Sequence, residues 1–380
     1  MKDTSTNGTS RSSIATRRPG PDWMPADFSR DTLPGRIVFG PGTVEGIADE
    51  LERLGVQRAM LIAAHYDSHL DFQATRVLGS RLQLRWNEVR QHVPNDLAHR
   101  ATAAAIDNSA DGLVTIGGGS TIGLGKAVAV NTDLPLLTVP TTYSGSEMTP
   151  IYGLTVDHHK STARDDRALP KVVIYDPELL TSLPPAVVGP SGMNALAHCA
   201  EALWAPRTDP ITDAIALDGA HRIGAHLRTA FTHDDAAGRG QMLIASCLAG
   251  VALGTVGTSL HHSLCHLLGG MFDSPHAETH AVMLPYVVQY LKSAVPLAVD
   301  RLSVAMNTTP DRLTDTIWSL GRSVGTPHGL RALGLTETQV LQAADAAWAN
   351  GFASPRSLNR SGLHRLLLGA FRGFAPSVSL

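Results

Sequence analysis

The chain has 380 residues, of which 43% are hydrophobic and 17% are charged, with a net charge of −3 at pH 7 and a mean hydropathy near zero. This length and composition predict a well-buried protein of two domains and exclude a disordered chain. The weakly negative charge does not support binding to nucleic acid, and no apolar run approaches the roughly 18 to 20 residues needed to span a bilayer.

The N-terminus and the cysteines bear on the cellular compartment. Residues 1–33 are rich in Ser, Thr, Arg and Pro and lack an apolar signal segment, so a mobile arm is expected there. Cys199, Cys247 and Cys265 are too few for a disulfide framework, which indicates a reducing, cytoplasmic setting. Cys199 and Cys265 each adjoin a histidine, but a small buried hydrophobic role is favoured over a catalytic thiol.

Strands and helices are expected to alternate after the arm. The predicted strands lie within 35–42, 57–64, 111–117, 134–142 and 171–180, with one more between about Leu82 and Ser109. Predicted helices fill 43–55, the stretch up to about Leu82, the stretch before Ser109, and 120–131. This alternation predicts a doubly wound parallel sheet.

The composition of the sequence changes after Pro184. Long Ala-, Leu- and His-rich segments run to the C-terminus, with glycines and prolines only between them, and predict an all-helical region. We therefore expect an α/β domain at 34–185 and an all-α domain at 186–380.

A glycine turn follows one of the predicted buried strands. Gly117, Gly118, Gly119 and Ser120 leave the strand, and a helix begins at Thr121. Glycines let a backbone approach a phosphate, and a helix N-terminus offers free N–H groups with a partial positive charge. A tight turn without a ligand is the alternative, and binding of a cofactor pyrophosphate is favoured.

Hydroxyl side chains follow the next predicted strand. The residues are Thr141, Thr142, Tyr143, Ser144 and Ser146. They should emerge at the carboxyl ends of the strands, where ligands bind in such sheets. We assign Thr141, Thr142 and Ser146 to the cofactor and Tyr143 to the substrate.

Histidines gather in the predicted helical region. His262 and His266 are four residues apart, as are His276 and His280, and Asn194 precedes His198 by the same spacing. That spacing stacks side chains on one face of a helix. Hydrogen-bonded core histidines are the alternative, but a polar site between helices is favoured for the group.

Several motifs together resemble the maleylacetate reductases of the iron-containing alcohol dehydrogenase superfamily. They read, in chain order, GGGSTIGLGKAVA, VPTTYSGSEMTPIYGLT, RDDRALPKVVIYDP, GMNALAHCAEALWAP, and LHHSLCHLLGG followed by SPHAETHAVMLPY. The resemblance implies a nucleotide-binding α/β domain, a helical domain of the dehydroquinate synthase-like fold, and an active site in the cleft between them. It further implies that NADH or NADPH reduces the carbon–carbon double bond of maleylacetate to give 3-oxoadipate in the degradation of aromatic compounds.

The superfamily's metal site maps onto Asn194, His198, His262 and His276, and Asn194 stands where a carboxylate is expected. A neutral amide is a weak ligand for a dication, so no metal is expected, although three histidines could still bind zinc. The resemblance places His266 beside the nicotinamide. We expect His262 and His266 to donate hydrogen bonds to an enolate, with His198 and His276 shaping the pocket.

One departure concerns the substrate. Ser263 stands where the family motif has lysine, and a dicarboxylate substrate should need cations. Arg164 is therefore assigned with Asn194 and Ser263 to substrate binding, and Lys160 to the cofactor. A solvated loop is the alternative for the segment that carries Lys160 and Arg164.

Ala64 and His65 end the second strand without an acid to repel a 2′-phosphate, so either NADH or NADPH is expected. A cytoplasmic homodimer with a small-molecule substrate and no nucleic-acid or membrane partner is expected. The alternatives are a paralogue with another substrate, a metal-dependent alcohol or aldehyde dehydrogenase, and a descendant that only binds a ligand.

Overall fold

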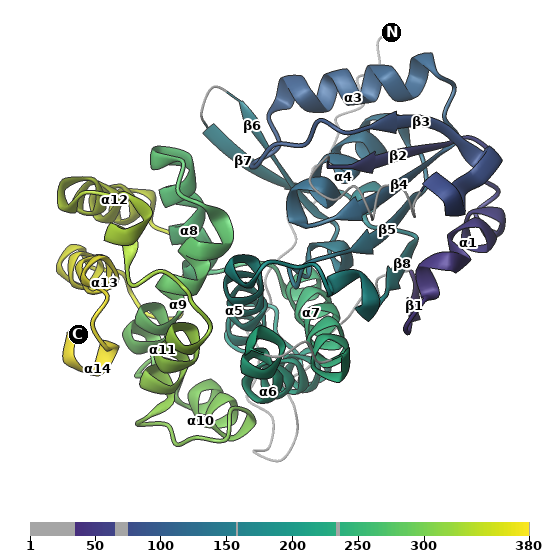
Figure 1. Cartoon of the computed structure of the whole chain (residues 1–380). Coiled ribbons are helices and arrows are strands. Elements are labelled where there is room, and N and C mark those ends of the chain that lie inside the picture. Colours follow the sequence, from purple (N-terminus) through teal and green to yellow (C-terminus); the bar gives the residue numbers. More distant parts are fainter. Residues whose placement is uncertain (1–34, 65–74, 157–158, 233–235, 380) are drawn as a thin grey trace, which may run out of the picture. The chain divides into compact units, whose positions relative to one another are not determined.

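The computed structural model describes residues 35–64, 75–156, 159–232 and 236–379. The arm predicted at 1–33 and His65 lie outside these residues. All the described residues belong to one compact unit, 31–380, in which a parallel sheet is followed along the chain by helices (Figure 1). This arrangement confirms the predicted fold class, while the domain boundaries at 34–185 and 186–380 remain predictions.

The sheet has six parallel strands in the spatial order β1-β8-β5-β4-β2-β3. The strands are β1 (Arg36–Phe39), β2 (Ala59–Ala63), β3 (Leu82–Trp86), β4 (Gly112–Gly117), β5 (Leu136–Pro140) and β8 (Val172–Tyr175). Since β4 lies on the opposite side of β2 from β3, the chain reverses its direction of progress between them. Ligands bind at such switch points in doubly wound sheets, and the glycine turn directly follows β4.

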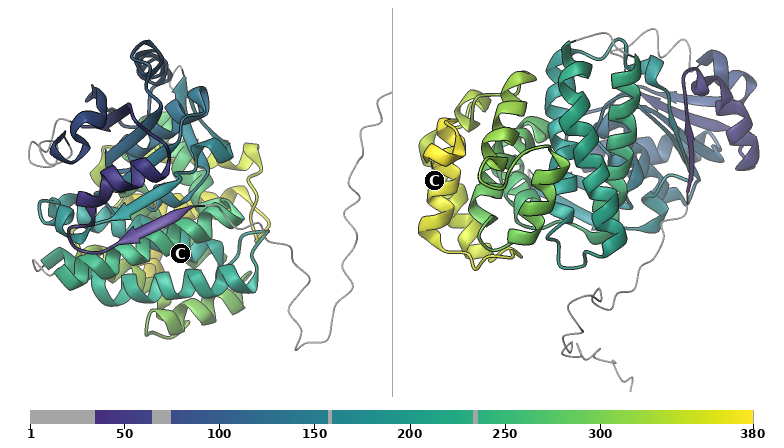
Figure 2. Two further views of the ribbon diagram at one scale, coloured as in Figure 1. Left: turned by 90° about the vertical axis from the view of Figure 1, so that its right-hand side faces the viewer. Right: turned by 90° about the horizontal axis from the view of Figure 1, so that it is seen from below.

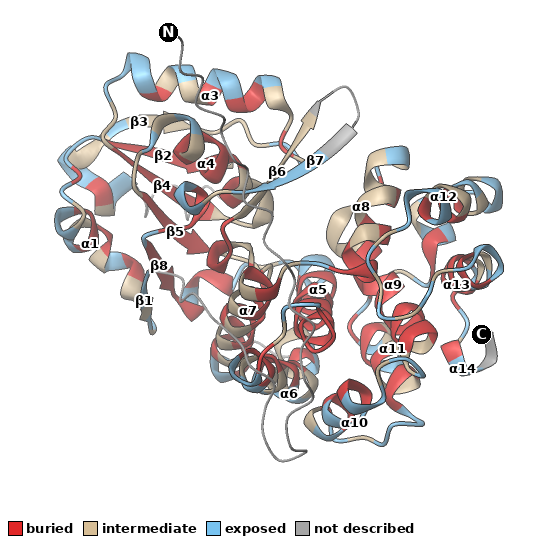
Figure 3. Cartoon of the chain, turned by 180° about the vertical axis from the view of Figure 1, so that it is seen from behind, coloured by how far each residue is buried: buried red, intermediate tan, exposed pale blue. Residues whose placement is uncertain are grey.

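Helices cover both faces of the sheet, and β2 shows why. Met60 and Ile62 pack with α3 (Asn95–Asp107) and α4 (Gly119–Thr132), whereas Leu61 belongs to the other core, with α1 (Ile47–Arg53). Successive side chains of a strand point to opposite faces, so a fully apolar strand is buried on both sides. Figure 3 shows these central strands as buried.

Close packing fixes the position of α4 on the sheet. A Cβ at Gly125 would lie 2.2 Å from the Thr115 methyl group, so only glycine allows α4 to lie this near β4. The N-terminus of α4 is thereby held at the carboxyl edge of the sheet.

One expectation about the α/β region was wrong, and one alternative is excluded. Leu82 begins β3 instead of ending a helix; the described helical residues before it are 75–78 and the 3₁₀ turn η2 (Gly79–Arg81). The segment for which a solvated loop was the alternative begins with a strand, β7 (His159–Arg164), which pairs with β6 (Ile151–Val156) in an antiparallel hairpin. The sequence of β7, HKSTAR, is almost entirely polar, so hydrophobic periodicity gave no strand signal there.

Ten helices of the described chain follow the sheet, and they confirm the predicted helical region. They are α5 (Pro185–Ala202), α6 (Pro210–Thr232), α7 (Ala236–Val256), α8 (Leu260–Phe272), α9 (His276–Leu291), α10 (Pro296–Ala305), α11 (Leu313–Ser323), α12 (Glu337–Asn350), α13 (Arg360–Arg372) and α14 (Pro376–Ser379). Figure 2 shows α5, α6 and α7 between the sheet and the C-terminal helices.

Helix α7 corrects the expectation that no segment is long and apolar enough to span a bilayer. It is long and apolar enough to cross a membrane by length and composition alone. Most of its side chains are buried against α5, α6 and the 3₁₀ turn η3 (Ser146–Met148). An apolar helix packed on several sides is typical of the core of a folded domain.

Candidate active site

A cavity of about 350 Å³ lies at the carboxyl edge of the sheet. Its wall is built from the N-terminus of α4, the loop after β5, the β6–β7 hairpin, and helices α5, α8 and α9. Residues far apart in sequence therefore meet in one cavity of the size of a small-molecule site.

The N-terminus of α4 opens into this cavity. Gly118 occupies the N-cap position and provides no side-chain cap, while Gly119 and Ser120 line the wall together with Thr142 and Ser144. The first N–H groups of a helix have no partner within the helix. Together with the helix dipole they suit a phosphate group.

The residues predicted to bind the cofactor fall into three sets. Gly119, Ser120, Thr142 and Ser146 line the cavity. Gly117, Gly118 and Thr141 are not part of its wall; the Gly117 carbonyl accepts the Thr141 N–H at 3.0 Å. The side chain of Lys160 lies outside the described residues. All of these binding roles remain predictions.

The four histidines predicted to be catalytic all line the cavity. The rings of His198 and His262 stack with their centroids 5.1 Å apart, those of His262 and His266 lie 6.0 Å apart, and those of His266 and His276 lie 5.8 Å apart. Helices α5, α8 and α9 thus bring together a continuous row of imidazoles.

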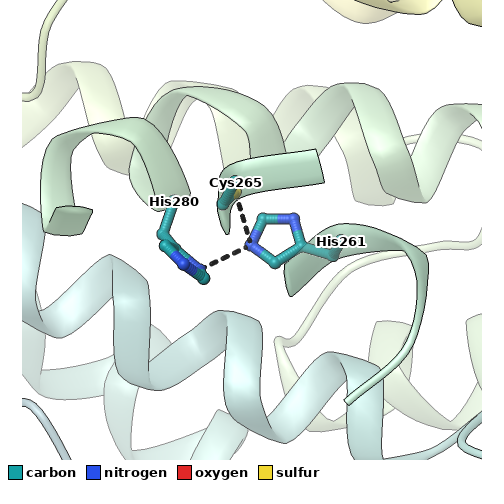
Figure 4. Close-up of side chains that lie close together, drawn as sticks. All are labelled: His261, Cys265 and His280. Atoms are coloured by element: carbon teal, nitrogen blue, oxygen red, sulfur yellow. Dashed lines mark hydrogen bonds between the residues drawn. The ribbon is translucent and has the colours of Figure 1, made fainter. Parts of the chain in front are cut away.

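A second group of side chains contacts this row of imidazoles, and Figure 4 shows its members. His261, Cys265 and His280 are buried, with His261 Nε2 3.0 Å from His280 Nδ1 and 3.8 Å from Cys265 Sγ. Burial lowers the pKa of His198, His261 and His280 well below the usual value, and neighbouring imidazoles lower it further. These three rings are therefore neutral at pH 7.

The cysteines behave as small apolar side chains. All three are buried, and burial raises the pKa of the Cys199 thiol and raises that of Cys247 to about 12. A buried thiol of this kind is a poor nucleophile. This agrees with the favoured interpretation of Cys199.

Glu201 is a site residue that sequence reasoning missed. Its carboxylate is fully buried on α5, accepts the His261 N–H at 2.8 Å and contacts Nδ1 of His262. The available signal was its spacing: Glu201 follows His198 by three residues and so shares a helix face with it.

Asn194 lies where the cavity meets α5. Its Nδ2 donates to the Ser144 carbonyl at 3.4 Å, and its buried Oδ1 has no hydrogen-bond partner. Nδ1 of His198 and Nε2 of His262 are likewise buried without a partner. Unpartnered polar atoms beside a cavity indicate a place where a ligand completes the hydrogen bonding.

Three residues assigned to the substrate do not line the cavity. Ser263 donates to the Ser259 carbonyl of its own helix at 2.9 Å, and Arg164 donates to the Gly254 carbonyl at 2.6 Å. Tyr143 is buried, and burial raises its pKa. Of the substrate set, Asn194 alone lines the wall, and the binding roles remain predictions.

A buried lysine anchors the loop below the cavity, and its role was not foreseen. Lys126 of α4 is fully buried, and its Nζ donates to the carbonyls of Ser146 at 2.5 Å, Thr149 at 2.7 Å and Ile151 at 2.8 Å. Burial lowers the pKa of Lys126 to about 7, while the nearby carboxyl of Glu147 acts in the opposite direction. The loop after β5 is thus fixed to the helix that opens into the cavity.

No Lys or Arg lines the cavity among the residues whose side chains are described. Two helix N-termini reach the wall, those of α4 and α9, and the first turn of α9 also brings the carboxyl side chain of Glu278 to it. Helix N-termini and imidazole N–H groups can stabilise an anion without a full positive charge nearby.

Comparison with known proteins gives one consistent result. Residues 34–177 match the family described as iron-containing alcohol dehydrogenase, and 189–371 match the C-terminal part of that family. The chain is 43% identical to maleylacetate reductase 2 of Cupriavidus pinatubonensis, over 92% of this chain and 98% of that protein. It is 41% identical to maleylacetate reductase of a Rhizobium strain, over 92% and 99%. The crystal structure of maleylacetate reductase from Agrobacterium tumefaciens superposes with a TM-score of 0.87 at 38% identity, over 92% and 99% of the two chains.

Proposed function

The chain belongs to the iron-containing alcohol dehydrogenase family, among its maleylacetate reductases, and on that premise we propose that it reduces maleylacetate to 3-oxoadipate with NADH or NADPH. The reaction saturates one carbon–carbon double bond of a product of aromatic-ring cleavage. A cytoplasmic homodimer is part of the proposal. Either cofactor is proposed because Ala64, directly after β2, offers no acid against a 2′-phosphate.

One observation carries the proposal. A single cavity holds both the bare N-terminus of α4 and the row of His198, His262, His266 and His276. A hydride donor held by its phosphates at α4 and a conjugated ketone held against imidazoles could meet there. The relatives named above carry the same activity in their names over nearly the full length of the chain.

The residues at α4 fit a dinucleotide. A Cβ at Gly119 would have only Ser144 within 4 Å, at 3.6 Å, so the space beside this glycine is open for a phosphate. Gly119, Ser120 and Thr142 would hold the pyrophosphate. The chemistry that a bound nicotinamide supplies is a hydride for the alkene carbon β to the substrate's ketone, which leaves the electron pair of the double bond on the ketone oxygen as an enolate.

The task of the imidazoles follows from this charge. A hydrogen-bond donor near the ketone oxygen stabilises the enolate, and a proton must then reach the carbon α to the ketone. His262 and His266 are four residues apart on one face of α8, so both can address one oxygen. The substrate is already activated by conjugation, and these donors complete the requirements of the step.

A divalent ion at the superfamily position does not fit these residues. Nitrogen ligands lie about 2.1 Å from zinc, so their donor atoms must lie within roughly 4 Å of one another. In the described chain, two groups of three ligand-type side chains have donor atoms within 4.8 Å: His261, Cys265 and His280, and His266, His276 and His280. Neither is the superfamily set, and Asn194 supplies a neutral amide where that set has a carboxylate.

The substrate's two carboxylates need partners in a cavity wall without described cations. We assign one carboxylate to the hydroxyls of the wall, such as that of Thr162. The first turn of α9 carries the Glu278 carboxyl, and the Thr149 hydroxyl is already bonded to Lys126. Arg164, two residues beyond Thr162 on β7, remains the candidate for the other carboxylate, for which its guanidinium must leave the Gly254 carbonyl.

The test is oxidation of NADH and of NADPH by purified, metal-stripped protein with maleylacetate, followed at 340 nm and by identification of 3-oxoadipate. A panel of simple alcohols, aldehydes and uncharged enones serves as the comparison. Activity confined to an alcohol or aldehyde, or activity that needs added metal, would overturn the proposal.

A further inference from the structure

We propose that Glu201 is a positioning residue that holds the ring of His262 so that its Nε2 is the proton donor to the enolate oxygen. The proposal rests on the reduction proposed above. It assigns a role to a carboxylate that lies behind the cavity wall instead of in it.

The two carboxylate oxygens of Glu201 have different partners. One oxygen accepts the His261 N–H at 2.8 Å, in the first turn of α8, and the other faces Nδ1 of His262. The side chain has 0% exposure, and no Lys or Arg of the described chain contacts it. The carboxylate therefore reaches from α5 to both the backbone and the ring on α8.

The direction of the hydrogen bond follows from the acceptor. An ionised carboxylate only accepts, so Nδ1 of His262 must carry the hydrogen. The remaining nitrogen, Nε2, is buried and without a hydrogen-bond partner in a residue that lines the cavity. The ring is thus oriented, with one nitrogen committed and the other available to a ligand.

A carboxylate contact distinguishes His262 from the three buried rings around it. His198, His261 and His280 are held neutral by burial and by the adjacent imidazoles. Nδ1 of His262 contacts a buried carboxylate, and this contact fixes which nitrogen of the ring faces the cavity. In the proposed step the ring enters with a hydrogen on each nitrogen, and the second hydrogen is the one at Nε2.

The step balances as follows. A hydride with its two electrons forms the new C–H bond at the carbon β to the ketone, and the electron pair of the double bond moves to the ketone oxygen. The Nε2 proton of His262 passes to that oxygen, and the enol converts to the ketone by taking a proton at the α carbon and releasing the one on oxygen. Water returns a proton to Nε2. Nδ1 keeps its own hydrogen throughout and donates it in a hydrogen bond to Glu201.

A purely structural role is the competing explanation, because Glu201 also caps the N-terminus of α8. Glu201→Gln separates the two roles. The amide oxygen still accepts the His261 N–H, but the amide nitrogen now donates to Nδ1 and displaces its hydrogen. We expect kcat to fall about 10- to 100-fold, the range for partners that orient a functional histidine, with KM for maleylacetate within about threefold and little change in Tm.

Asp209→Asn is the matched control. Asp209 is a buried carboxylate that caps α6, accepting the N–H groups of Ile211 at 2.9 Å and Thr212 at 3.0 Å. The same change from acid to amide at this cap should lower Tm by as much as Glu201→Gln or more, and leave kcat within about twofold.

Two further measurements decide the proposal. In a His262→Ala background, Glu201→Gln should lower kcat by no more than about twofold, because its target is gone. In ¹⁵N-histidine NMR, the signal that His262→Ala removes should show an Nδ1–H in the parent and lose it in Glu201→Gln. An unchanged kcat, an equal loss in the His262→Ala background, or an Nδ1–H that survives in Glu201→Gln would each overturn the proposal. If the parent enzyme does not reduce maleylacetate, the proposed function fails, and the NMR measurement still decides the positioning of the ring.

Discussion

The three consecutive glycines after β4 provide the most discriminating test of the cofactor site. Gly119→Ala adds one methyl group at the first residue of α4. The nearest atoms to that methyl, Cβ and Oγ of Ser144, would lie at 3.6 Å, which is an ordinary contact. The protein can therefore accept the change without moving, and the methyl occupies space where a phosphate would approach.

The two effects of this methyl have opposite signs. Alanine is a better helix residue than glycine, by up to about 1 kcal/mol, so Tm should stay constant or rise. Loss of one backbone hydrogen bond to a charged phosphate costs about 1.5 to 3 kcal/mol. At about 1.4 kcal/mol for each factor of ten, KM for NADH or NADPH should rise roughly 10- to 150-fold.

Substitutions at the two neighbouring glycines are the controls, because they should disturb the fold as well as the cofactor site. A Cβ at Gly118 would lie 2.9 Å from the Thr142 methyl, so Gly118→Ala should shift a wall residue and affect both Tm and KM. Gly117 has φ near +153°, and its Cβ would lie 2.5 Å from Thr121 Oγ1, so Gly117→Ala should chiefly lower Tm.

The assay is a titration of NADH and of NADPH at saturating substrate, beside thermal unfolding of each variant. The reasoning is refuted if Gly119→Ala binds both cofactors as tightly as the parent protein. It is refuted equally if Gly119→Ala raises KM for the cofactor and also lowers Tm, because the glycine would then serve the turn.

Four other predictions address the metal, the donors, the substrate and acid stability. Asn194→Asp should bind zinc or iron more tightly than the parent because it restores a carboxylate, and elemental analysis showing near one metal per parent chain, with activity lost to a chelator, would contradict the argument. His266→Ala should lower kcat by about 10²- to 10⁴-fold, and His266→Asn should recover part of the loss through its amide donor; equal activity of the alanine variant and the parent would remove His266 from the mechanism. Ser263→Lys should lower KM for maleylacetate by adding a cation near the cavity, and a raised KM, with poor activity of the parent on this substrate, would indicate a less anionic substrate. The three buried histidines with a lowered pKa take up protons below pH 6.5 in the unfolded chain before they do so in the folded protein. The free energy of unfolding should therefore decrease as the pH falls below 6.5, and urea titrations that are flat from pH 7.5 to 5 would show that burial does not hold these rings neutral.

The fold was largely predictable because its signals are local. The apolar stretch around Met60–Ile62 and the glycine turn at 117–119 each define an element from adjacent residues. The β6–β7 hairpin was not predicted because its second strand, HKSTAR, is almost entirely polar and shows no apolar alternation beside the apolar first strand. The end of the helix before β3 was predicted wrongly because Leu82 suits a helix and a strand equally well.

The site was predictable only where its residues share a helix. His262 and His266 meet because they lie one turn apart, and the spacing of Asn194 and His198 predicted the same arrangement on α5. The contact between Glu201 and His262 depends on how α5 packs against α8, which no spacing in the sequence encodes. The positions of Ser263 and Tyr143 outside the cavity wall depend on the same packing and on the direction in which each side chain leaves its element.

The anchor at Lys126 also bears on how this enzyme family could diversify. Three of the four oxygens that Nζ contacts belong to the main chain, those of Ser146, Thr149 and Ile151, and the fourth is the Thr149 hydroxyl. A carbonyl is present whatever side chain its residue carries, so replacing Ser146 or Ile151 keeps the anchor intact. The same residues line the cavity. Evolution can therefore exchange these wall side chains at little cost to the framework, which makes this loop a natural place for one scaffold to acquire new substrates.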